Sequence, residues 1–232
     1  PKSIGVEWTN TAFEYDGAPH KPTATATGLV GDDSLTLNVT GEQTNAGSYT
    51  ATVAAFEQGN YKLAEEATIK FTIARKTVSV AWGNTEFTYN GSAQKPNATV
   101  GEGLVSGDDL QITVRGEQTN AGDDYTATAE ITGGEDMGNY VLDGSASTSF
   151  TIAPKSIGVE WTNTEFTYDG TAHKPTATAT ELVGEDTLTL TVTGEQTNAN
   201  AEGETYTATV KAFIDGNYKL DQDATVEFTI AP

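Results

Sequence analysis

The pattern that organises this chain first occurs as Phe13-Glu14-Tyr15-Asp16-Gly17-Ala18-Pro19-His20-Lys21-Pro22. It returns, with Phe, Tyr, Gly, Lys and Pro at the same places, at residues 87–96 and 166–175. A second marker, Gly-Glu-Gln-Thr-Asn-Ala, follows each copy at residues 41–46, 116–121 and 194–199, and a third, Phe-Thr-Ile-Ala, follows at 71–74, 150–153 and 228–231. The chain is therefore one unit written three times, which we number repeat 1 (residues 1–74), repeat 2 (75–153) and repeat 3 (154–232).

Each repeat opens on a stretch in which apolar residues alternate with other residues. The alternating residues are Ile4, Val6 and Trp8 in repeat 1, Val78, Val80 and Trp82 in repeat 2, and Ile157, Val159 and Trp161 in repeat 3. A period of two over six residues predicts one half-buried strand. We expect the three tryptophans to be core residues, because a large ring stabilises a small core. The alternative is an exposed ring on which a sugar stacks.

The rest of each repeat is also typical of short strands joined by tight turns. Asp16-Gly17, Asn90-Gly91 and Asp169-Gly170 supply the positive φ that such turns require. No stretch of ten residues has helical spacing, so we expect at most one short helical turn per repeat. Extra residues near 133–136 in repeat 2 and 200–203 in repeat 3 mark surface loops. The pattern predicts an all-β fold of three tandem domains with the boundaries given above.

Composition excludes several classes of function. The chain has no cysteine, which excludes disulfides and thiolate chemistry, and a net charge of −21 that is spread over the repeats as −5, −7 and −9. A surface this acidic repels phosphate backbones and anionic lipid, so we predict no nucleic-acid partner. No apolar run approaches the ~18 residues needed to span a bilayer, so we predict no membrane insertion in this segment. The acidity itself indicates a solvated surface or, alternatively, one that binds divalent cations.

The residues able to carry chemistry are few. His20 and His173 occupy one repeat position at which repeat 2 has Gln94, so we interpret them as polar turn residues rather than members of a catalytic triad. We predict no enzyme and no catalytic, cofactor-binding or metal-ligating residue.

Two alternatives remain open at the sequence level. The acidic pairs Asp32-Asp33, Asp108-Asp109 and Glu185-Asp186 suit solvated turns, or calcium near the repeat junctions. An intramolecular isopeptide bond would need Lys, Asn and an acid together in an apolar setting. Residues of these types recur as Lys21, Lys95 and Lys174, as Asn60, Asn139 and Asn217, and as Glu42, Glu117 and Glu195.

The joints between repeats are short. Only Ala74-Arg75-Lys76 and Ala153-Pro154-Lys155 separate one closing strand from the next opening strand. Short joints force neighbouring repeats into contact, and Pro154 restricts the backbone at the second joint. We expect a monomer in which the repeats are one another's partners and form an elongated rod.

Several of these motifs together resemble the MBG ("mostly β-grasp") repeats of bacterial surface adhesins. The resemblance rests in repeat 1 on residues 13–17, 41–53, 59–61 and 71–73, and it extends over all three repeats. Asn90 and Arg75 depart from the pattern in repeat 2, as does the insertion before Tyr206 in repeat 3. The resemblance implies small β-grasp-like sheet domains, repeated within large secreted proteins anchored to the wall or membrane. Such arrays act as stalks, and the family has no catalytic residues to transfer.

These observations predict a non-catalytic stalk or spacer segment of a bacterial surface adhesin, which projects a distal binding domain from the cell. The alternative is a direct adhesive module that binds host glycan or protein, for which an exposed aromatic cluster on one repeat would argue. The chain opens on Pro1 and closes on the same Ile-Ala-Pro that joins repeats 2 and 3. We therefore expect a segment of a longer array that is extracellular, at the bacterial cell surface, with its signal and anchor outside it.

Overall fold

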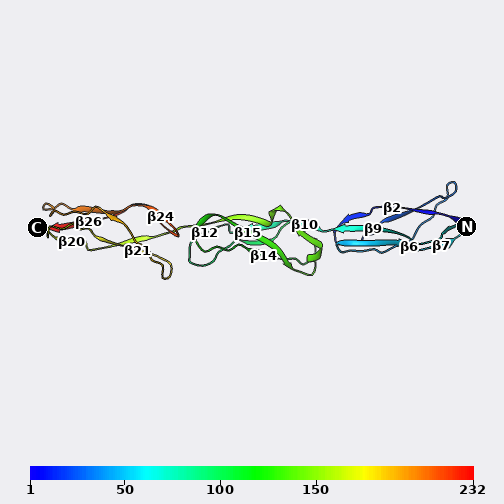
Figure 1. The fold of residues 1–232 in the computed structure, drawn as a ribbon, viewed down its shortest axis with the longest axis horizontal. Coiled ribbons are helices and arrows are strands. Elements are labelled where there is room, and N and C mark those ends of the chain that lie inside the picture. Colours follow the sequence, from blue (N-terminus) through cyan, green and yellow to red (C-terminus); the bar gives the residue numbers. More distant parts are fainter. The chain divides into compact units, whose positions relative to one another are not determined.

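The computed structural model describes residues 1–232 and is all-β, as the sequence predicts (Figure 1). The strands of repeat 1 are β1 (Lys2–Ser3), β2 (Gly5–Thr9), β3 (Ala12–Glu14), β4 (Thr23–Thr27), β5 (Val39–Thr40), β6 (Gly47–Val53), β7 (Phe56–Gln58), β8 (Tyr61–Leu63) and β9 (Ala67–Ala74). Those of repeat 2 are β10 (Lys76–Val78), β11 (Val80–Gly83), β12 (Glu86–Thr88), β13 (Asn97–Val100), β14 (Gln111–Arg115), β15 (Gly122–Gly133), β16 (Tyr140–Leu142) and β17 (Ser147–Ala153). Those of repeat 3 are β18 (Lys155–Ser156), β19 (Gly158–Thr162), β20 (Glu165–Thr167), β21 (Thr176–Thr180), β22 (Val192–Thr193), β23 (Tyr206–Val210), β24 (Phe213–Asp215), β25 (Tyr218–Leu220) and β26 (Ala224–Ala231).

The only helical segments are two 3-10 turns of three residues each, η1 (Met137–Asn139) and η2 (Gly144–Ala146). Both lie in repeat 2, so the expectation of at most one helical turn per repeat is wrong there. The cause at η2 is local, because the Asp143 side chain accepts a hydrogen bond from the backbone N–H of Ser145 and caps the turn. The chain contains no helix of the length and apolar character that crossing a membrane requires.

The chain divides into two compact units that do not coincide with the three repeats. Unit 1 consists of Pro1–Trp82, Ala98–Val114 and Thr128–Ser147, and unit 2 of Gly83–Asn97, Arg115–Ala127 and Thr148–Pro232. Repeat 1 is wholly in unit 1 and repeat 3 wholly in unit 2, so the division runs through repeat 2. The joint at residues 74–76 is therefore internal to unit 1, and the joint at 153–155 is internal to unit 2.

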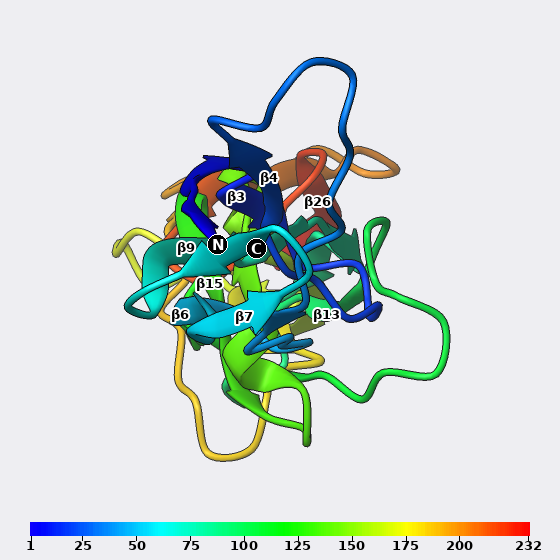
Figure 2. The ribbon, with the colours of Figure 1, turned by 90° about the vertical axis from the view of Figure 1, so that its right-hand side faces the viewer.

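Unit 1 is built on a four-stranded mixed sheet in the order β3-β9-β6-β5. β3 pairs in parallel with β9, whereas β6 pairs antiparallel with both β9 and β5. Strands β6 and β9 lie side by side, and the segment between β4 and β5, drawn in blue, projects as a loop (Figure 2). The parallel pair is possible because the intervening strands carry the chain back to the start of the sheet.

The opening stretch of each repeat forms two short strands instead of the single strand that its period of two predicts. In repeat 1, β1 pairs in parallel with β8, and β2 pairs antiparallel with β4. The chain changes sheets at Ile4, whose side chain is buried among Val53, Tyr61 and Leu63. The alternation was therefore real, but it gave no information on the strands' partners, which are set by contacts far along the chain.

Unit 2 repeats this design around repeat 3. Its four-stranded sheet has the order β20-β26-β23-β22, again with a parallel pair, β20 and β26, and an antiparallel pair, β23 and β26. From repeat 2, β12 pairs in parallel with β17 through residues Thr151, Ile152 and Ala153. In each repeat, the closing strand therefore pairs with an early strand of the same repeat.

The first two sequence markers meet in every repeat. The backbones of His20 and Gln43 form a pair of hydrogen bonds at 2.7 and 2.9 Å, and so do those of His173 and Gln196. The corresponding distances between Gln94 and Gln118 are 2.8 and 2.9 Å. The glycine that begins the second marker has a positive φ, and a Cβ on Gly41 would stand 2.5 Å from the carbonyl oxygen of Thr50. Only glycine fits this approach.

The tryptophans are half-buried rather than fully buried, which corrects the expectation that they are core residues. Trp8 and Trp161 pack against the edges of buried clusters. The indole N–H of Trp82 donates to the backbone oxygen of Ser145 at 2.7 Å. Tyrosine, phenylalanine and isoleucine side chains form the centres of the cores instead, among them Phe71, Phe150 and Phe228.

Candidate functional site at the repeat junctions

The joint between repeats 1 and 2 is held by two tyrosines and one carboxylate. Tyr15 follows β3 in repeat 1, and its hydroxyl donates to Asp108 Oδ2 at 2.7 Å. The Tyr140 hydroxyl of repeat 2 donates to the same oxygen at 2.5 Å. It also accepts a hydrogen bond from the backbone N–H of Val105, which fixes the loop that carries the acid. The two rings meet edge to face with centroids 5.5 Å apart, a favourable aromatic geometry. We call these three residues the first tyrosine–aspartate cluster.

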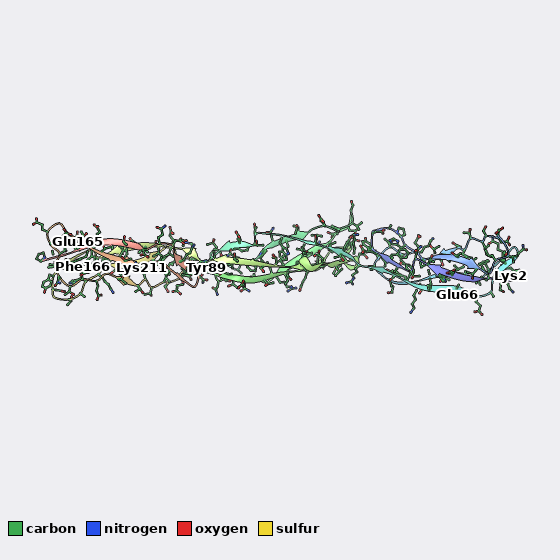
Figure 3. All side chains as sticks on the ribbon, turned by 90° about the horizontal axis from the view of Figure 1, so that it is seen from above. Lys2, Glu66, Tyr89, Glu165, Phe166 and Lys211 are labelled. Carbon is green, nitrogen blue, oxygen red and sulfur yellow. The ribbon has the colours of Figure 1, made fainter.

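The joint between repeats 2 and 3 has the same construction. Tyr89 and Tyr218 donate to Asp186 Oδ2 at 2.8 and 2.6 Å, and their rings meet edge to face at 5.5 Å. The backbone N–H of Val183 donates to the Tyr218 hydroxyl at 2.8 Å. Figure 3 labels Tyr89 in the region where repeat 2 meets repeat 3. These three residues are the second tyrosine–aspartate cluster, and its agreement with the first shows that the arrangement belongs to the repeat.

An asparagine of each following repeat caps a backbone amide of the repeat before it. Asn139 Oδ1 accepts from the N–H of Ala46 at 2.8 Å, and its Nδ2 donates to Asn45 Oδ1 at 3.3 Å. At the second joint, Asn217 makes the same two bonds to Ala121 and Asn120, at 2.7 and 3.2 Å. These bonds give the Thr-Asn-Ala and Gly-Asn-Tyr sequences a shared role, since the side chain of the second satisfies the backbone of the first.

A glycine and a valine form the close contact of each junction. Gly17 has a φ of 80°, and a Cβ placed on it would stand 3.0 Å from Cγ1 of Val105 in the next repeat. At the second junction, a Cβ on Gly91 would stand 2.7 Å from Cγ1 of Val183. The glycine therefore serves the turn and also leaves room for the neighbouring repeat.

The hydrophobic core of unit 1 continues across the joint. One cluster of buried residues combines Tyr15, Phe71 and Ile73 of repeat 1 with Val78 and Tyr140 of repeat 2. Repeats 1 and 2 therefore share apolar contacts as well as hydrogen bonds, which explains why the joint lies inside a compact unit.

The protonation states of the first cluster favour the closed junction. Burial and the hydrogen bond to Asp108 raise the pKa of Tyr15 to about 12. Burial, followed by the bond to Asp108, also raises the pKa of Tyr140. Near neutral pH, both tyrosine hydroxyls are therefore protonated and able to donate.

The second cluster shifts in the same direction. The bond to Asp186 and burial raise the pKa of Tyr89, while burial and then the bond to Asp186 raise that of Tyr218. Hydrogen bonds from Tyr218 and Tyr89 lower the pKa of Asp186. Such charge-assisted bonds are stronger than bonds between neutral groups.

Each acidic pair noted in the sequence contains one aspartate that binds a tyrosine hydroxyl. One member of each pair, Asp33, Asp108 or Asp186, accepts a tyrosine hydroxyl from the same repeat. The sequence predicted solvated turns or calcium here and missed this contact. No group of three or more His, Cys, Asp or Glu residues is placed to hold a metal ion.

The two histidines lie in their turns. His20 Nε2 is 2.8 Å from Asp16 Oδ1, and the imidazole stacks on Phe13 with centroids 4.6 Å apart. His173 repeats this with Asp169 and Phe166. In repeat 2, Gln94 Nε2 donates to the backbone oxygen of Thr88 instead. Both residue types thus bond within the turn region that carries them.

The lysines and glutamates considered for an isopeptide bond pair with one another, whereas two of the three asparagines lie at the junctions. The three lysines form ion pairs at 3.5 Å with the three glutamates, Lys21 with Glu42, Lys95 with Glu117 and Lys174 with Glu195. These side chains are largely exposed. Asn139 and Asn217 lie at the junctions, bonded to backbone amides. The apolar setting that the reaction needs is therefore missing around the lysines.

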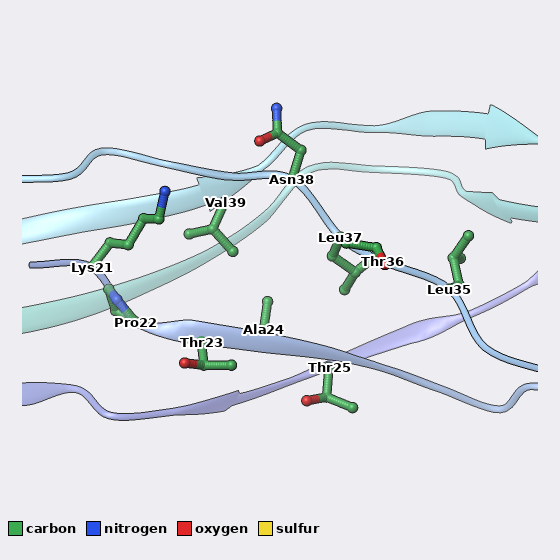
Figure 4. Close-up of a pocket in the computed structure, with 10 residues that line it drawn as sticks. All are labelled: Lys21, Pro22, Thr23, Ala24, Thr25, Leu35, Thr36, Leu37, Asn38 and Val39. Carbon is green, nitrogen blue, oxygen red and sulfur yellow. The ribbon is translucent and has the colours of Figure 1, made fainter.

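Repeat 1 also has a surface hollow between β4 and residues 35–39 (Figure 4). Ala24, Leu37 and Val39 turn toward one another, and they pack on the core of their own repeat. The one charged residue of the lining, Lys21, is paired with Glu42. All residues of its lining belong to repeat 1, whereas the junctions bring side chains of two repeats together.

Comparison of the chain with protein-family models, with curated proteins and with solved structures finds no match.

Proposed function

We propose that this chain is a non-catalytic stalk or spacer segment of a bacterial surface adhesin. In this proposal it is extracellular, at the bacterial cell surface, and holds a distal binding domain away from the cell. The observation that supports the proposal is that both junctions are built from the same packed contacts. Both joints between repeats have a tyrosine–aspartate cluster, an asparagine cap and a valine–glycine contact, with matching distances. A spacer needs joints that resist bending, and packed contacts of this kind restrict bending more than a flexible linker does.

The sheet topology supports the MBG-like part of the proposal. In repeats 1 and 3 the closing strand pairs in parallel with an early strand and antiparallel with a middle strand. This mixed order is compatible with small β-grasp-like domains at residues 1–74, 75–153 and 154–232. The resemblance of the motifs to MBG repeats supports the location at the cell surface.

The adhesive alternative has less support. It calls for a cluster of exposed aromatic side chains on one repeat, and the large apolar side chains that are exposed include a single aromatic, Tyr168. Tyr168 occupies the repeat position of Tyr15 and Tyr89, which are buried, and one exposed ring does not make a cluster. We therefore propose no second function.

Small-angle scattering at low protein concentration tests the proposal. We expect an extended profile with a maximum dimension of ~100 Å, estimated from the size of three ~75-residue domains. The double variant Tyr15→Ala with Tyr89→Ala should broaden the distance distribution, because both junctions lose their central contact. Tyr168→Ala is the matched control, since it removes the same side chain from the same turn without touching a junction.

Two results would contradict a spacer role. One is a wild-type protein with a compact distribution ending at ~60 Å. The other is a wild-type protein that already fits a broad flexible ensemble, since such joints could not hold a binding domain at a distance.

A further inference from the structure

The turn at the second junction contains the only Asn-Gly sequence of the chain, Asn90-Gly91. Asn90 is exposed, and its Oδ1 accepts the backbone N–H of Ser92 at 2.9 Å. This bond folds the side-chain amide back toward the main chain that follows it. Gly91 has a φ of 78° and no side chain to shield its own backbone nitrogen. The turn therefore holds an exposed amide next to an unshielded nitrogen nucleophile.

This pair of residues can undergo a defined reaction with water. The backbone nitrogen of Gly91 attacks Cγ of Asn90, and the side-chain nitrogen leaves as ammonia with the proton of the Gly91 amide. A five-membered imide remains. Water that opens its bond between Cγ and nitrogen leaves aspartate in a normal backbone. Water that opens its bond between the main-chain carbonyl carbon and nitrogen leaves isoaspartate, in which the backbone runs through Cβ and Cγ and is longer by one CH₂ group.

Aspartate already occupies this position in the other two repeats. Asp16 Oδ1 accepts the N–H of Ala18 at 2.8 Å. Asp169 Oδ1 accepts the N–H of Thr171 at the same distance. Conversion of Asn90 to aspartate therefore gives a side chain that this turn accommodates, with a charged acceptor in place of a neutral one.

Isoaspartate differs because both neighbours of Asn90 hold the second junction. The Tyr89 hydroxyl donates to Asp186 at 2.8 Å. Gly91 lies against Val183, whose Cγ1 would be 2.7 Å from a Cβ at this glycine. The extra backbone atom of isoaspartate falls between these two contacts, so at least one of them has to shift.

We propose that Asn90 is a deamidation site whose two products have opposite effects on the second junction. Aspartate preserves the junction, and isoaspartate opens it. The first junction has Asp16 at this position, and a carboxylate loses water far less readily than an amide loses ammonia. The second junction therefore reacts first. This inference rests on the geometry of that junction and is independent of the stalk role.

Incubation of the intact folded chain at mildly alkaline pH tests the site. Peptide mass spectrometry locates the conversion of amide to acid, and electron-transfer fragmentation distinguishes aspartate from isoaspartate. Asn97 is the internal control, because it is exposed in the same repeat but lies in β13 and precedes Ala98. We expect Asn90 to convert at least about tenfold faster than Asn97, which corresponds to about 1.4 kcal/mol of activation free energy.

Amide hydrogen exchange tests the effect on the junction. The N–H of Ala121 donates to Asn217 across the second junction. Isolated isoaspartyl protein should exchange at Ala121 at least about tenfold faster than the fresh chain, as expected for loss of a hydrogen bond to a charged group. Exchange at Ala46, which reports on the first junction, should be unchanged. A freshly prepared Asn90→Asp variant should exchange at both amides as the wild type does.

Three outcomes would overturn the proposal. The first is a chain in which Asn97 converts as fast as Asn90, or in which Asn90 converts only after unfolding in urea. The second is isoaspartyl protein whose Ala121 amide is as protected as in the fresh chain. The third is a fresh Asn90→Asp variant that already exchanges faster at Ala121, since the turn would then not accommodate aspartate.

Discussion

Replacing Tyr15 by Phe should loosen the first junction and leave the second unchanged. The substitution keeps the buried ring and removes one hydroxyl, which donates at 2.7 Å to a carboxylate. A hydrogen bond to a charged group contributes about 1.5–3 kcal/mol. Asp108 keeps its bond from Tyr140, and water can reach a partly exposed carboxylate. We therefore expect a loss of about 1–2 kcal/mol.

Amide hydrogen exchange measures this loss of junction stability at a single residue, Ala46. The N–H of Ala46 donates to Asn139 across the first junction, and the N–H of Ala121 donates to Asn217 across the second. Each amide exchanges when its junction opens. A loss of 1–2 kcal/mol should speed exchange at Ala46 by a factor of about 5–30 and leave Ala121 unchanged.

Two further substitutions make the prediction specific. Tyr89→Phe should speed exchange at Ala121 and spare Ala46, whereas Tyr168→Phe should affect neither amide. If Tyr15→Phe speeds exchange equally at both amides, the junctions do not open independently. If Tyr168→Phe has as large an effect as Tyr15→Phe, the hydroxyl acts within its own repeat and the reasoning is wrong.

The pKa of Tyr15 is raised from near 10 to about 12, so the stability that its protonated hydroxyl contributes is complete below pH 10 and is lost as the pH rises through 12. Thermal melts across this range, with tyrosinate absorbance at 295 nm, check the sign of this pH dependence. Trp8→Ala should lower the free energy of unfolding in urea by about 2–3 kcal/mol, less than the 3–5 kcal/mol of a fully buried ring, because the indole is half-buried. A larger loss would mean that the indole is more central to the core than its exposure indicates. The double variant His20→Gln with His173→Gln should unfold within about 0.5 kcal/mol of the wild type, because Gln94 already occupies this position in repeat 2, and a larger change in the urea midpoint would show that the stacked imidazole matters.

Much of the local structure could be predicted from the sequence, because turn chemistry and alternation are local signals. The Asp16-Gly17 turn adopts the positive φ that its residues predict, and the Asp side chain bonds the N–H of Ala18 at 2.8 Å. Asn90 makes the same bond to Ser92, which explains why Asp and Asn alternate at this position. The insertion near residue 200 lies in an exposed loop, as expected.

The partners of the strands and of the acidic residues could not be predicted in this way. A period of two indicates which residues share a face but not which strand lies beside them, so the change of sheet at Ile4 was missed. Tyr15 and Asp108 are 93 residues apart, and no local pattern connects them. One signal was present: an aspartate lies three residues after the valine of the loop in every repeat, at Val30, Val105 and Val183. The extra residue Ser106 in repeat 2 changes the spacing from the glycine of the loop to this aspartate, while the spacing from the valine stays the same.

The tyrosine of the first marker shows what the next repeat contributes. Tyr15, Tyr89 and Tyr168 stand in nearly identical local sequences and make the same backbone bond to the end of the closing strand. Two are buried and the third is half exposed, so the following repeat, and not the local sequence, buries the ring. Covering about half of a tyrosine removes roughly 100 Å² from water, which at ~25 cal/mol per Å² amounts to ~2.5 kcal/mol per junction before the hydroxyl is considered. That energy belongs to a pair of repeats. The stability of such a chain is therefore a sum of repeat terms and junction terms, and the junction terms are the ones that a change at Tyr15 or Tyr89 can alter while the turn itself stays folded.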